Sequence, residues 1–469
     1  MQTINDNNHA TLTIYDTANR RVVTQTDDNG NTTTYIYDGL NRKVIEAYAD
    51  CTANQFTFDP HDNNIFWTDG NENQVTQTYD NNDRLVRRDV IPGPGVSDDT
   101  TFEVYKYDGL SRLTWAEDDD TLVTRQYDSL SRVTRETQNL FDGCDRTWPT
   151  AVVTSDYDGV GNMLTLGYPS GRVITTTYDE LERKKTIVDT TNPGQPEPIA
   201  TYWFVGPGRV AQREYGNGTR SEWTYDGITG VANPPNDFGV KRIMRTNHYR
   251  ISDGETIDDR TYTWDRMSNK TQRRDIRTDG AWTPRLQHDY QYDNVYRLVQ
   301  SDKSDPTGPI ETIQYILDGV GNRSEVIGGP DAGVYTMDAS LCEPADRQLN
   351  QYTTTSGRAL RYAGTGFLLE WHNDRFVPDF RDRVVETSRG QAQLRYDAIG
   401  RRALTKSYEA PCERIVYTAT WQELEITRSQ GQVEVETRVH GRYLDDMVQI
   451  VVNTVRIYSY RDDLSTCSA

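Results

Sequence analysis

The sequence predicts an all-β protein, an array of repeated β-hairpins that pair into one long antiparallel sheet. The dipeptide Tyr-Asp recurs ten times along the chain. The segments on either side of it are rich in Thr, Tyr and β-branched residues, as is typical of strands. Only 35% of the 469 residues are hydrophobic, which is low for a chain of dense cores, whereas 29 Tyr, 10 Phe and 9 Trp exclude an unfolded chain.

The repeat is longer than the dipeptide. In eight of the ten copies an Arg follows four residues after the Asp, where chance would give about 0.5 copies. Where no insertion intervenes, successive copies lie 20–22 residues apart; longer steps contain turn-rich inserts, at residues 92–95 and 142–145. The eight complete copies form the predicted structural repeat motif: Tyr15, Asp16, Arg20; Tyr37, Asp38, Arg42; Tyr79, Asp80, Arg84; Tyr107, Asp108, Arg112; Tyr127, Asp128, Arg132; Tyr178, Asp179, Arg183; Tyr292, Asp293, Arg297; and Tyr396, Asp397, Arg401.

Each unit is predicted to be one hairpin. Residues 32–37 and 74–79 have strand composition before the motif, and residues 84–88 resume it afterwards. Between the strands, residues 38–41 form a turn cluster in which Asp and Asn bond their own backbone and Gly supplies a positive φ. We expect the Asp to cap the turn, and the Arg to reach that Asp or to lie on a Tyr ring of its own or a neighbouring unit. The alternative role for the Tyr residues is a stacking platform for nucleic acid or sugar.

At these residues the sequence resembles the YD-repeat, or RHS (rearrangement hot spot), family. This family includes bacterial polymorphic toxins, the B and C components of Tc toxin complexes, and the teneurins. The resemblance extends from Tyr15 to about Leu464 and implies a long sheet that spirals into a hollow shell around a C-terminal polypeptide. Residues 396–402, 440–446 and 458–464 resemble the segments that precede the family's self-cleaving core domain. No core motif D-P-x-G follows these segments before Ala469, so we expect a fragment of a larger shell, without cleavage site or payload.

The spacing of the motif suggests three regions. Residues 1–327 are predicted to be YD-repeat shell. Residues 328–395 hold only degenerate copies, which indicates an insertion or drifted repeats, and residues 396–469 hold a terminal repeat and the segment leading to the missing core.

No catalytic, cofactor-binding or metal-binding residue is predicted. The acidic stretches at residues 27–31 and 69–73 offer oxygen ligands for calcium, but their spacing is not that of an EF-hand, so acidic turns are the favoured interpretation. The five Cys lie far apart and are predicted to form neither a disulfide framework nor a zinc site.

Charge and hydropathy narrow the function. A net charge of −20 disfavours nucleic acid as a partner, and neither a membrane-spanning apolar run nor a signal peptide is found in this chain. We therefore expect a non-catalytic encapsulation module, secreted or at the cell surface as part of a larger protein, that sequesters a C-terminal toxin or cargo polypeptide. The alternative is an extracellular adhesion module of teneurin type, which binds glycans or cell-surface proteins. A weaker alternative is a carbohydrate-active enzyme, for which the sequence cannot select a pair of carboxylates.

Overall fold

The computed structural model is all-β, as predicted. It describes residues 2–4, 10–18, 20–141, 144, 147–227, 242–277, 285–337, 350–388, 392–407, 410–430, 432–442 and 446–459. These residues form strands β1 to β40 and no helix, so none of them forms a helix that could cross a membrane. Each strand pairs antiparallel with the next one along the chain, for example β4 with β5 and β39 with β40, so the sheet is one long meander.

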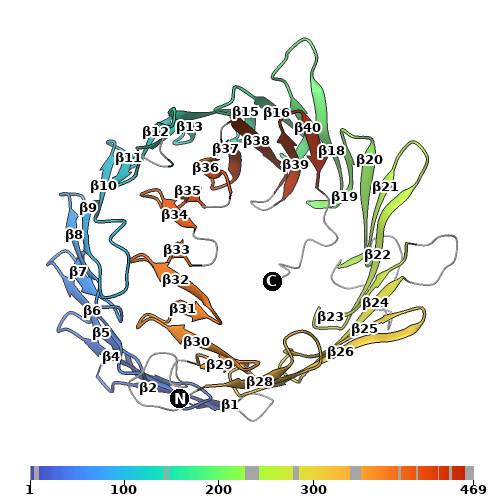
Figure 1. Ribbon diagram of the computed structural model, residues 1–469. Coiled ribbons are helices and arrows are strands. Elements are labelled where there is room, and N and C mark those ends of the chain that lie inside the picture. Colours follow the sequence, from blue (N-terminus) through green and yellow to red (C-terminus); the bar gives the residue numbers. More distant parts are fainter. Residues whose placement is uncertain are drawn as a thin grey trace.

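The sheet winds around an open central space and then continues inside its own first circuit (Figure 1). We call strands β1–β28 the outer layer and strands β29–β40 the inner layer. The outer strands are β1 Gln2–Ile4, β2 Ala10–Tyr15, β3 Val22–Thr26, β4 Thr32–Tyr37, β5 Lys43–Ala47, β6 Ala53–Phe58, β7 Asn64–Thr68, β8 Gln74–Tyr79, β9 Leu85–Ile91, β10 Phe102–Tyr107, β11 Leu113–Asp118, β12 Thr121–Tyr127, β13 Val133–Leu140, β14 Ala151–Tyr157, β15 Met163–Gly167, β16 Val173–Tyr178, β17 Lys184–Asp189, β18 Glu197–Val205, β19 Arg209–Tyr215, β20 Thr219–Tyr225, β21 Ile243–Arg250, β22 Thr256–Trp264, β23 Lys270–Asp275, β24 Leu286–Tyr292, β25 Leu298–Asp305, β26 Gly308–Leu317, β27 Arg323–Ile327 and β28 Gly333–Thr336.

The inner layer follows the path of strands β2–β19 on the side of the central space (Figure 1). Its strands are β29 Thr354–Thr355, β30 Arg358–Tyr362, β31 Leu368–Trp371, β32 Asp374–Pro378, β33 Val384–Thr387, β34 Gln393–Tyr396, β35 Arg402–Lys406, β36 Cys412–Tyr417, β37 Glu423–Gln430, β38 Gln432–His440, β39 Met447–Val452 and β40 Val455–Tyr458. The change from outer to inner layer therefore falls within the region predicted to hold degenerate repeats.

The motif hairpins share one turn geometry. In the hairpin of β10 and β11, the pairing shifts by one residue between Lys106 and Tyr107, which is a β-bulge. The residue directly before the motif Arg has a positive φ, 62° at Ser111 and 97° at Gly400. The sequence had suggested the Gly that follows the Asp, as in Gly39, but Asn41 (φ 69°) supplies that conformation in its turn, because the bulge needs it next to the Arg.

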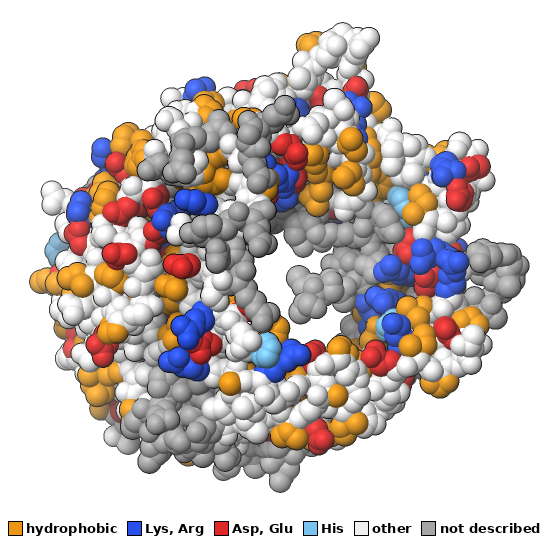
Figure 2. Space-filling model, viewed as in Figure 1, with side chains coloured by type: hydrophobic (Ala, Val, Ile, Leu, Met, Phe, Trp, Pro, Cys, Tyr) orange, Lys and Arg blue, Asp and Glu red, His pale blue; other side chains and the backbone are white. Residues whose placement is uncertain are grey.

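The main hydrophobic core lies between the two layers. It joins outer residues such as Val153, Ile187 and Trp223 to inner residues such as Leu424 and Val448 in one cluster of buried side chains. Three smaller clusters also join the layers, and the wall is one sheet thick along β23–β26, where none of the inner strands β29–β40 lies beside it (Figure 1). On the face seen in Figure 2, Lys and Arg side chains lie mixed with Asp and Glu around the central opening. This distribution agrees with the low hydrophobic content, since much of the sheet has only one face to bury.

Candidate functional site

The repeated Tyr-Asp turn is the first candidate site. In the copy at Tyr107, one carboxylate oxygen of Asp108 accepts hydrogen bonds from the backbone N–H groups of Leu110 (2.9 Å) and Arg112 (3.0 Å). Its other oxygen accepts the Nε–H of Arg112 at 2.6 Å. The Asp side chain thus caps its own turn, because it accepts hydrogen bonds from backbone N–H groups that the bulge leaves unpaired.

The same motif also binds to the next copy. Arg112 Nη1 donates to the carbonyl oxygen of Asp128 at 2.9 Å, and its guanidinium carbon lies 4.7 Å from the ring centre of Tyr127. The hydroxyl of Tyr127 in turn donates to the carbonyl oxygen of Leu113 at 2.7 Å. Arg112 therefore lies on the Tyr of the following unit and links neighbouring hairpins at one edge of the sheet, and Arg42 and Arg183 lie in the same way on Phe58 and Phe204.

Seven of the eight predicted copies have the same Asp–Arg contact. The Nε–Oδ2 distances are 2.6–2.8 Å for the pairs Arg42–Asp38, Arg84–Asp80, Arg112–Asp108, Arg132–Asp128, Arg183–Asp179, Arg297–Asp293 and Arg401–Asp397. In the first copy, Arg21 and not Arg20 donates to Asp16 (2.7 Å). The prediction of Arg20 was wrong because this turn is one residue longer, with Asp16 N–H bonded to the carbonyl of Arg21.

The eight complete copies do not include every turn that has this geometry. Arg242 lies 16 residues after Asp226, yet it donates to that carboxylate and to the carbonyl of Asp265, as a motif Arg does. In other copies Asn replaces Arg: Asn162 Nδ2 donates to Asp158 Oδ2 at 2.8 Å. The signal in the sequence is the pattern Asp-x-x-x-Asn, which also occurs at Asp59, Asp265 and Asp318.

The acidic stretches considered for calcium have this turn geometry too. Asp27 Oδ1 accepts the backbone N–H groups of Asn29 and Asn31, and Asp69 Oδ1 accepts those of Asn71 and Asn73. The carboxylates are thus used within their own turns, and the part of the chain that the structure describes holds no group of three or more potential metal ligands.

The electrostatics of the turn favour an ionised Asp. The side-chain hydrogen bond from Arg84 lowers the pKa of Asp80, and the backbone N–H groups of Asn82 and Arg84 lower it further. At Asp179, the hydrogen bond from Arg183 has the same effect on the pKa. The carboxylates of Asp80 and Asp179 therefore stay ionised well below neutral pH.

The second candidate site is the contact between the layers, where motif turns of the inner layer press against outer strands. The hydroxyl of Tyr105 on β10 donates to the carbonyl oxygen of Ala398 at 3.0 Å. Gln138 on β13 accepts the backbone N–H of Tyr417 and donates to its carbonyl oxygen (3.1 and 2.7 Å). We call this set of contacts the seam; it joins residues nearly 300 positions apart in sequence.

Charged groups are buried in the seam. Arg401 Nη1 lies 2.7 Å from Glu136 Oε1, and both side chains are almost fully buried. Arg381 similarly contacts Glu103, which is also paired with Arg88. An inner motif turn that meets the outer layer therefore has an ion-pair partner on an outer strand, in addition to the contacts within its own layer.

Burial perturbs one seam carboxylate strongly. Desolvation raises the pKa of Asp118, at the end of β11, to about 8, and the charge of Asp397 in the inner layer raises it further. The N–H of Thr121 and its hydroxyl donate to the same carboxylate oxygen. Desolvation also raises the pKa of Asp99 and of Glu425, which contacts the backbone of Ser170.

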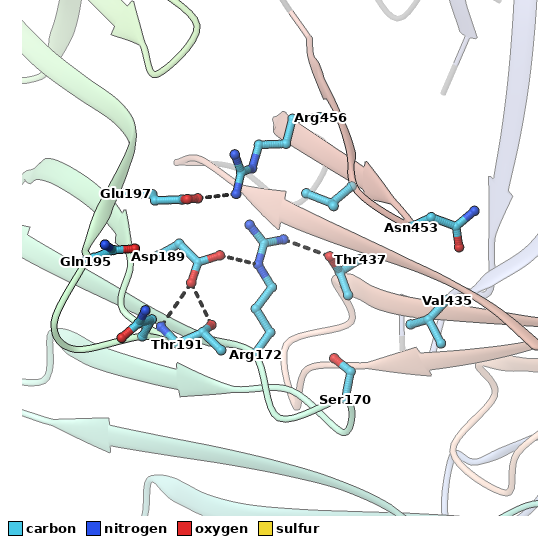
Figure 3. A pocket seen from close by; sticks show the side chains of 12 residues that line it. Ser170, Arg172, Asp189, Thr191, Gln195, Glu197, Val435, Thr437, Asn453 and Arg456 are labelled. Atoms are coloured by element: carbon cyan, nitrogen blue, oxygen red, sulfur yellow. Dashed lines mark hydrogen bonds and ion pairs between the residues drawn. The ribbon is translucent and has the colours of Figure 1, made fainter.

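A cavity of about 430 Å³ opens at the seam between β16–β17 and the last inner strands (Figure 3). Arg172 crosses it, and donates to Asp189 (2.8 Å), Thr437 (2.8 Å) and Gln449 (2.5 Å). Across the cavity Arg456 is paired with Glu197. The bonds from Arg172 to Thr437 and Gln449, and the pair of Arg456 with Glu197, link one layer to the other, so the residues that line this cavity hold the two layers together.

Two cysteines form a disulfide that joins the layers, whereas the spacing of the five Cys predicted no disulfide framework. Cys144 of the outer layer and Cys412 of the inner layer form a disulfide with a Cα–Cα distance of 6.1 Å. They are 268 residues apart in sequence, so spacing along the chain could not reveal that the winding of the sheet brings them together. Residues 142, 143 and 145 of the same insert, and residues 460–464 of the predicted terminal segment, lie outside the described residues.

These features define a wall: a YD-type strip of hairpins wound on itself and joined layer to layer. No family model and no curated protein matches the chain. Solved structures of Tc toxin components share its fold. TcdB2-TccC3-TEV is 15% identical, with a TM-score of 0.72 over 97% of this chain. TcdB2-TccC3 without its hypervariable C-terminal region is 15% identical, with a TM-score of 0.71 over 98% of this chain.

A Photorhabdus luminescens Tc holotoxin pore with a mutated TccC3 is 14% identical, with a TM-score of 0.64 over 95% of this chain. The chain spans about a quarter of the length of the solved chains, 25%, 25% and 23% of them respectively. The likeness confirms the predicted resemblance to YD-repeat shells at the level of the fold.

Proposed function

We propose that the chain is a structural encapsulation module, part of a YD-repeat shell that encloses a C-terminal toxin or cargo polypeptide until delivery. The observation that carries this proposal is the seam. A sheet that served only to present a surface would not need buried ion pairs such as Arg401–Glu136 between successive windings. A container does, because its wall must stay continuous where one winding meets the next.

The motif residues support the same role as structural elements. Each Asp and Arg is used within its own turn and against the next hairpin, as at Asp108, Arg112 and Asp128. These contacts give the motif a structural role in the wall. We assign it no catalytic step.

The disulfide supports a location outside the cytoplasm. Disulfides such as Cys144–Cys412 persist in oxidising compartments and are rare in the cytosol. We therefore propose that the chain acts as part of an exported or cell-surface protein.

Protease protection tests containment. A polypeptide that cannot fold alone, carrying one site for a sequence-specific protease, is fused after Ala469. The same polypeptide fused before Met1 is the matched control. We expect cleavage of the C-terminal fusion to be at least tenfold slower than that of the N-terminal fusion, and the Arg401→Ala change to speed it, because that change opens the seam.

Equal cleavage of the two fusions would contradict containment. Retention of the chain on a glycan array, combined with equal cleavage, would instead favour the adhesion alternative.

A further inference from the structure

The insert between β13 and β14 reaches across the seam. Trp148 in this insert is almost fully buried, and packs in one cluster with Leu140 of the outer layer and with Leu404 and Cys412 of the inner layer. The inner residue Arg414 donates to the carbonyl oxygens of Pro149 and Gln138. The insert that lengthens this repeat is therefore an anchor for the inner layer.

Cys144 makes this anchor covalent. It lies in the insert, whereas Cys412 is the first residue of β36, so the disulfide links the outer layer to the inner one at a single point. The neighbouring seam contacts, Arg401–Glu136 and Gln138–Tyr417, are not covalent. Once the disulfide opens, the inner strands near it are held by non-covalent contacts alone.

We propose that the Cys144–Cys412 disulfide is a redox latch, which keeps the inner layer seated in an oxidising environment and releases it when a thiol reductant opens the bond. The latch concerns the wall itself. Its test therefore does not depend on whether the wall encloses a cargo.

The two sulfurs differ in access. Cys412 is 7% exposed, whereas Cys144 is only partly buried. A small thiolate therefore attacks the sulfur of Cys144, the Cys144–Cys412 bond breaks, and Cys412 leaves as a thiolate that takes up a proton. A second thiol of the reductant then attacks the mixed disulfide and releases Cys144 as a thiol. The reductant leaves as its own disulfide, so two thiols supply the two electrons that the latch takes up.

A large effect is expected from the topology. A cross-link between residues 268 positions apart removes much of the freedom that the two layers would gain on separating, and in the chain-entropy account this constraint grows with loop length. Reduction raises the conformational entropy of the state in which the layers are separated. Local opening of the inner layer therefore becomes more frequent.

Hydrogen exchange of the backbone amides, read by mass spectrometry, tests the latch. The wild-type chain is compared before and after treatment with dithiothreitol, and both with the double variant C144S/C412S kept oxidised. We expect amides of β35–β37 to exchange at least tenfold faster in the reduced wild type and in the oxidised double variant. Amides of β24–β26, which lie far from the latch along the outer layer, serve as the internal control and are expected to stay unchanged.

The double variant separates this disulfide from others. Cys51 is disulfide-bonded as well, so dithiothreitol alone would not identify the responsible bond. If the oxidised double variant exchanges like the oxidised wild type, the latch is wrong. It is also wrong if the unreduced wild type yields alkylated Cys144 and Cys412 in place of a cross-linked peptide. If the double variant does not fold, the wild type is titrated with glutathione buffers. The amount of cross-linked Cys144–Cys412 peptide and the exchange of β35–β37 amides are followed together. The latch requires that both change at the same potential, and a change at different potentials would contradict it.

Discussion

Arg401 of the inner layer and Glu136 of the outer layer form an ion pair at 2.7 Å in which neither side chain is more than 1% exposed. Arg401 is also the motif Arg of its own turn, paired with Asp397 at 2.8 Å. Its counterpart in an outer turn, Arg112, makes the same contact with its own Asp but keeps 21% of its side chain exposed. One repeated residue therefore has two environments, and the winding of the sheet decides which.

The two arginines should differ strongly when removed. Arg112→Ala is expected to lower the free energy of unfolding by less than ~1 kcal/mol, because the pair is partly exposed and one of many. Arg401→Ala is expected to lower it by about 3–5 kcal/mol, because the buried carboxylate of Asp397 loses its Arg and the buried Glu136 keeps only Arg125 as an ion-pair partner. Urea unfolding of both variants measures the difference. Equal losses would show that Arg401 is not enclosed by the seam.

The Tyr hydroxyl of the motif should contribute one ordinary hydrogen bond. Tyr127→Phe removes the bond to the carbonyl oxygen of Leu113 but keeps the ring beneath Arg112. We expect a loss of about 0.5–1.5 kcal/mol. The natural copy at Phe58, over which Arg42 lies at 5.0 Å, shows that the ring alone can serve. A loss above about 3 kcal/mol in thermal unfolding would contradict this account.

The buried carboxyl of Asp118 should lower the free energy of unfolding as the pH rises. Its pKa is about 8 in the folded chain, against ~3.9 for an unfolded Asp. Between these values the folded state binds a proton that the unfolded state does not, so stability falls as the pH rises through this window. Asp80 and Asp179, whose pKa is lowered, act in the opposite sense and only in acid, where their protonation removes stability.

Asp118→Asn isolates this effect. The Asn carbonyl can still accept the bonds from Thr121, while the buried charge is removed. Asp397, which is paired with Arg401, faces the site from the inner layer, and Arg395 pairs with the nearby Asp120 (3.3 Å). We expect the variant to be nearly as stable as wild type at about pH 3, where Asp118 is protonated in both states, and more stable by about 3–5 kcal/mol at pH 9. A difference that does not change with pH in thermal melts would contradict the assignment.

The apolar tip of the motif turn should matter only where it is covered. Leu110 at a free outer turn is 67% exposed, whereas Ile399 at the same motif position packs against the cluster that contains Tyr105 and Ala116. Leu110→Ser is expected to change stability by less than ~0.5 kcal/mol. Ile399→Ser is expected to cost about 2 kcal/mol or more. Both are measured by urea unfolding, and a large loss at Leu110 would mean that this edge is not free.

The repeat made much of the local structure predictable. The Asp and Arg of one turn are four residues apart, so composition and spacing were enough to expect the hairpin, the Asp cap and the Arg on a neighbouring Tyr. The exceptions are also local in origin. Arg21 replaces Arg20 because one turn is a residue longer, and Arg242 escaped notice because a long insertion separates it from Asp226.

The sequence by itself determined the hairpin unit and its turn chemistry, because these depend on residues that are neighbours along the chain. Only the tertiary structure decided the partners across the seam, such as Glu136 with Arg401 and Cys144 with Cys412. Those partners depend on how far the sheet bends and twists at each of many strands before it meets itself. Small rotations summed over a whole circuit set that meeting point, and no local pattern records the sum.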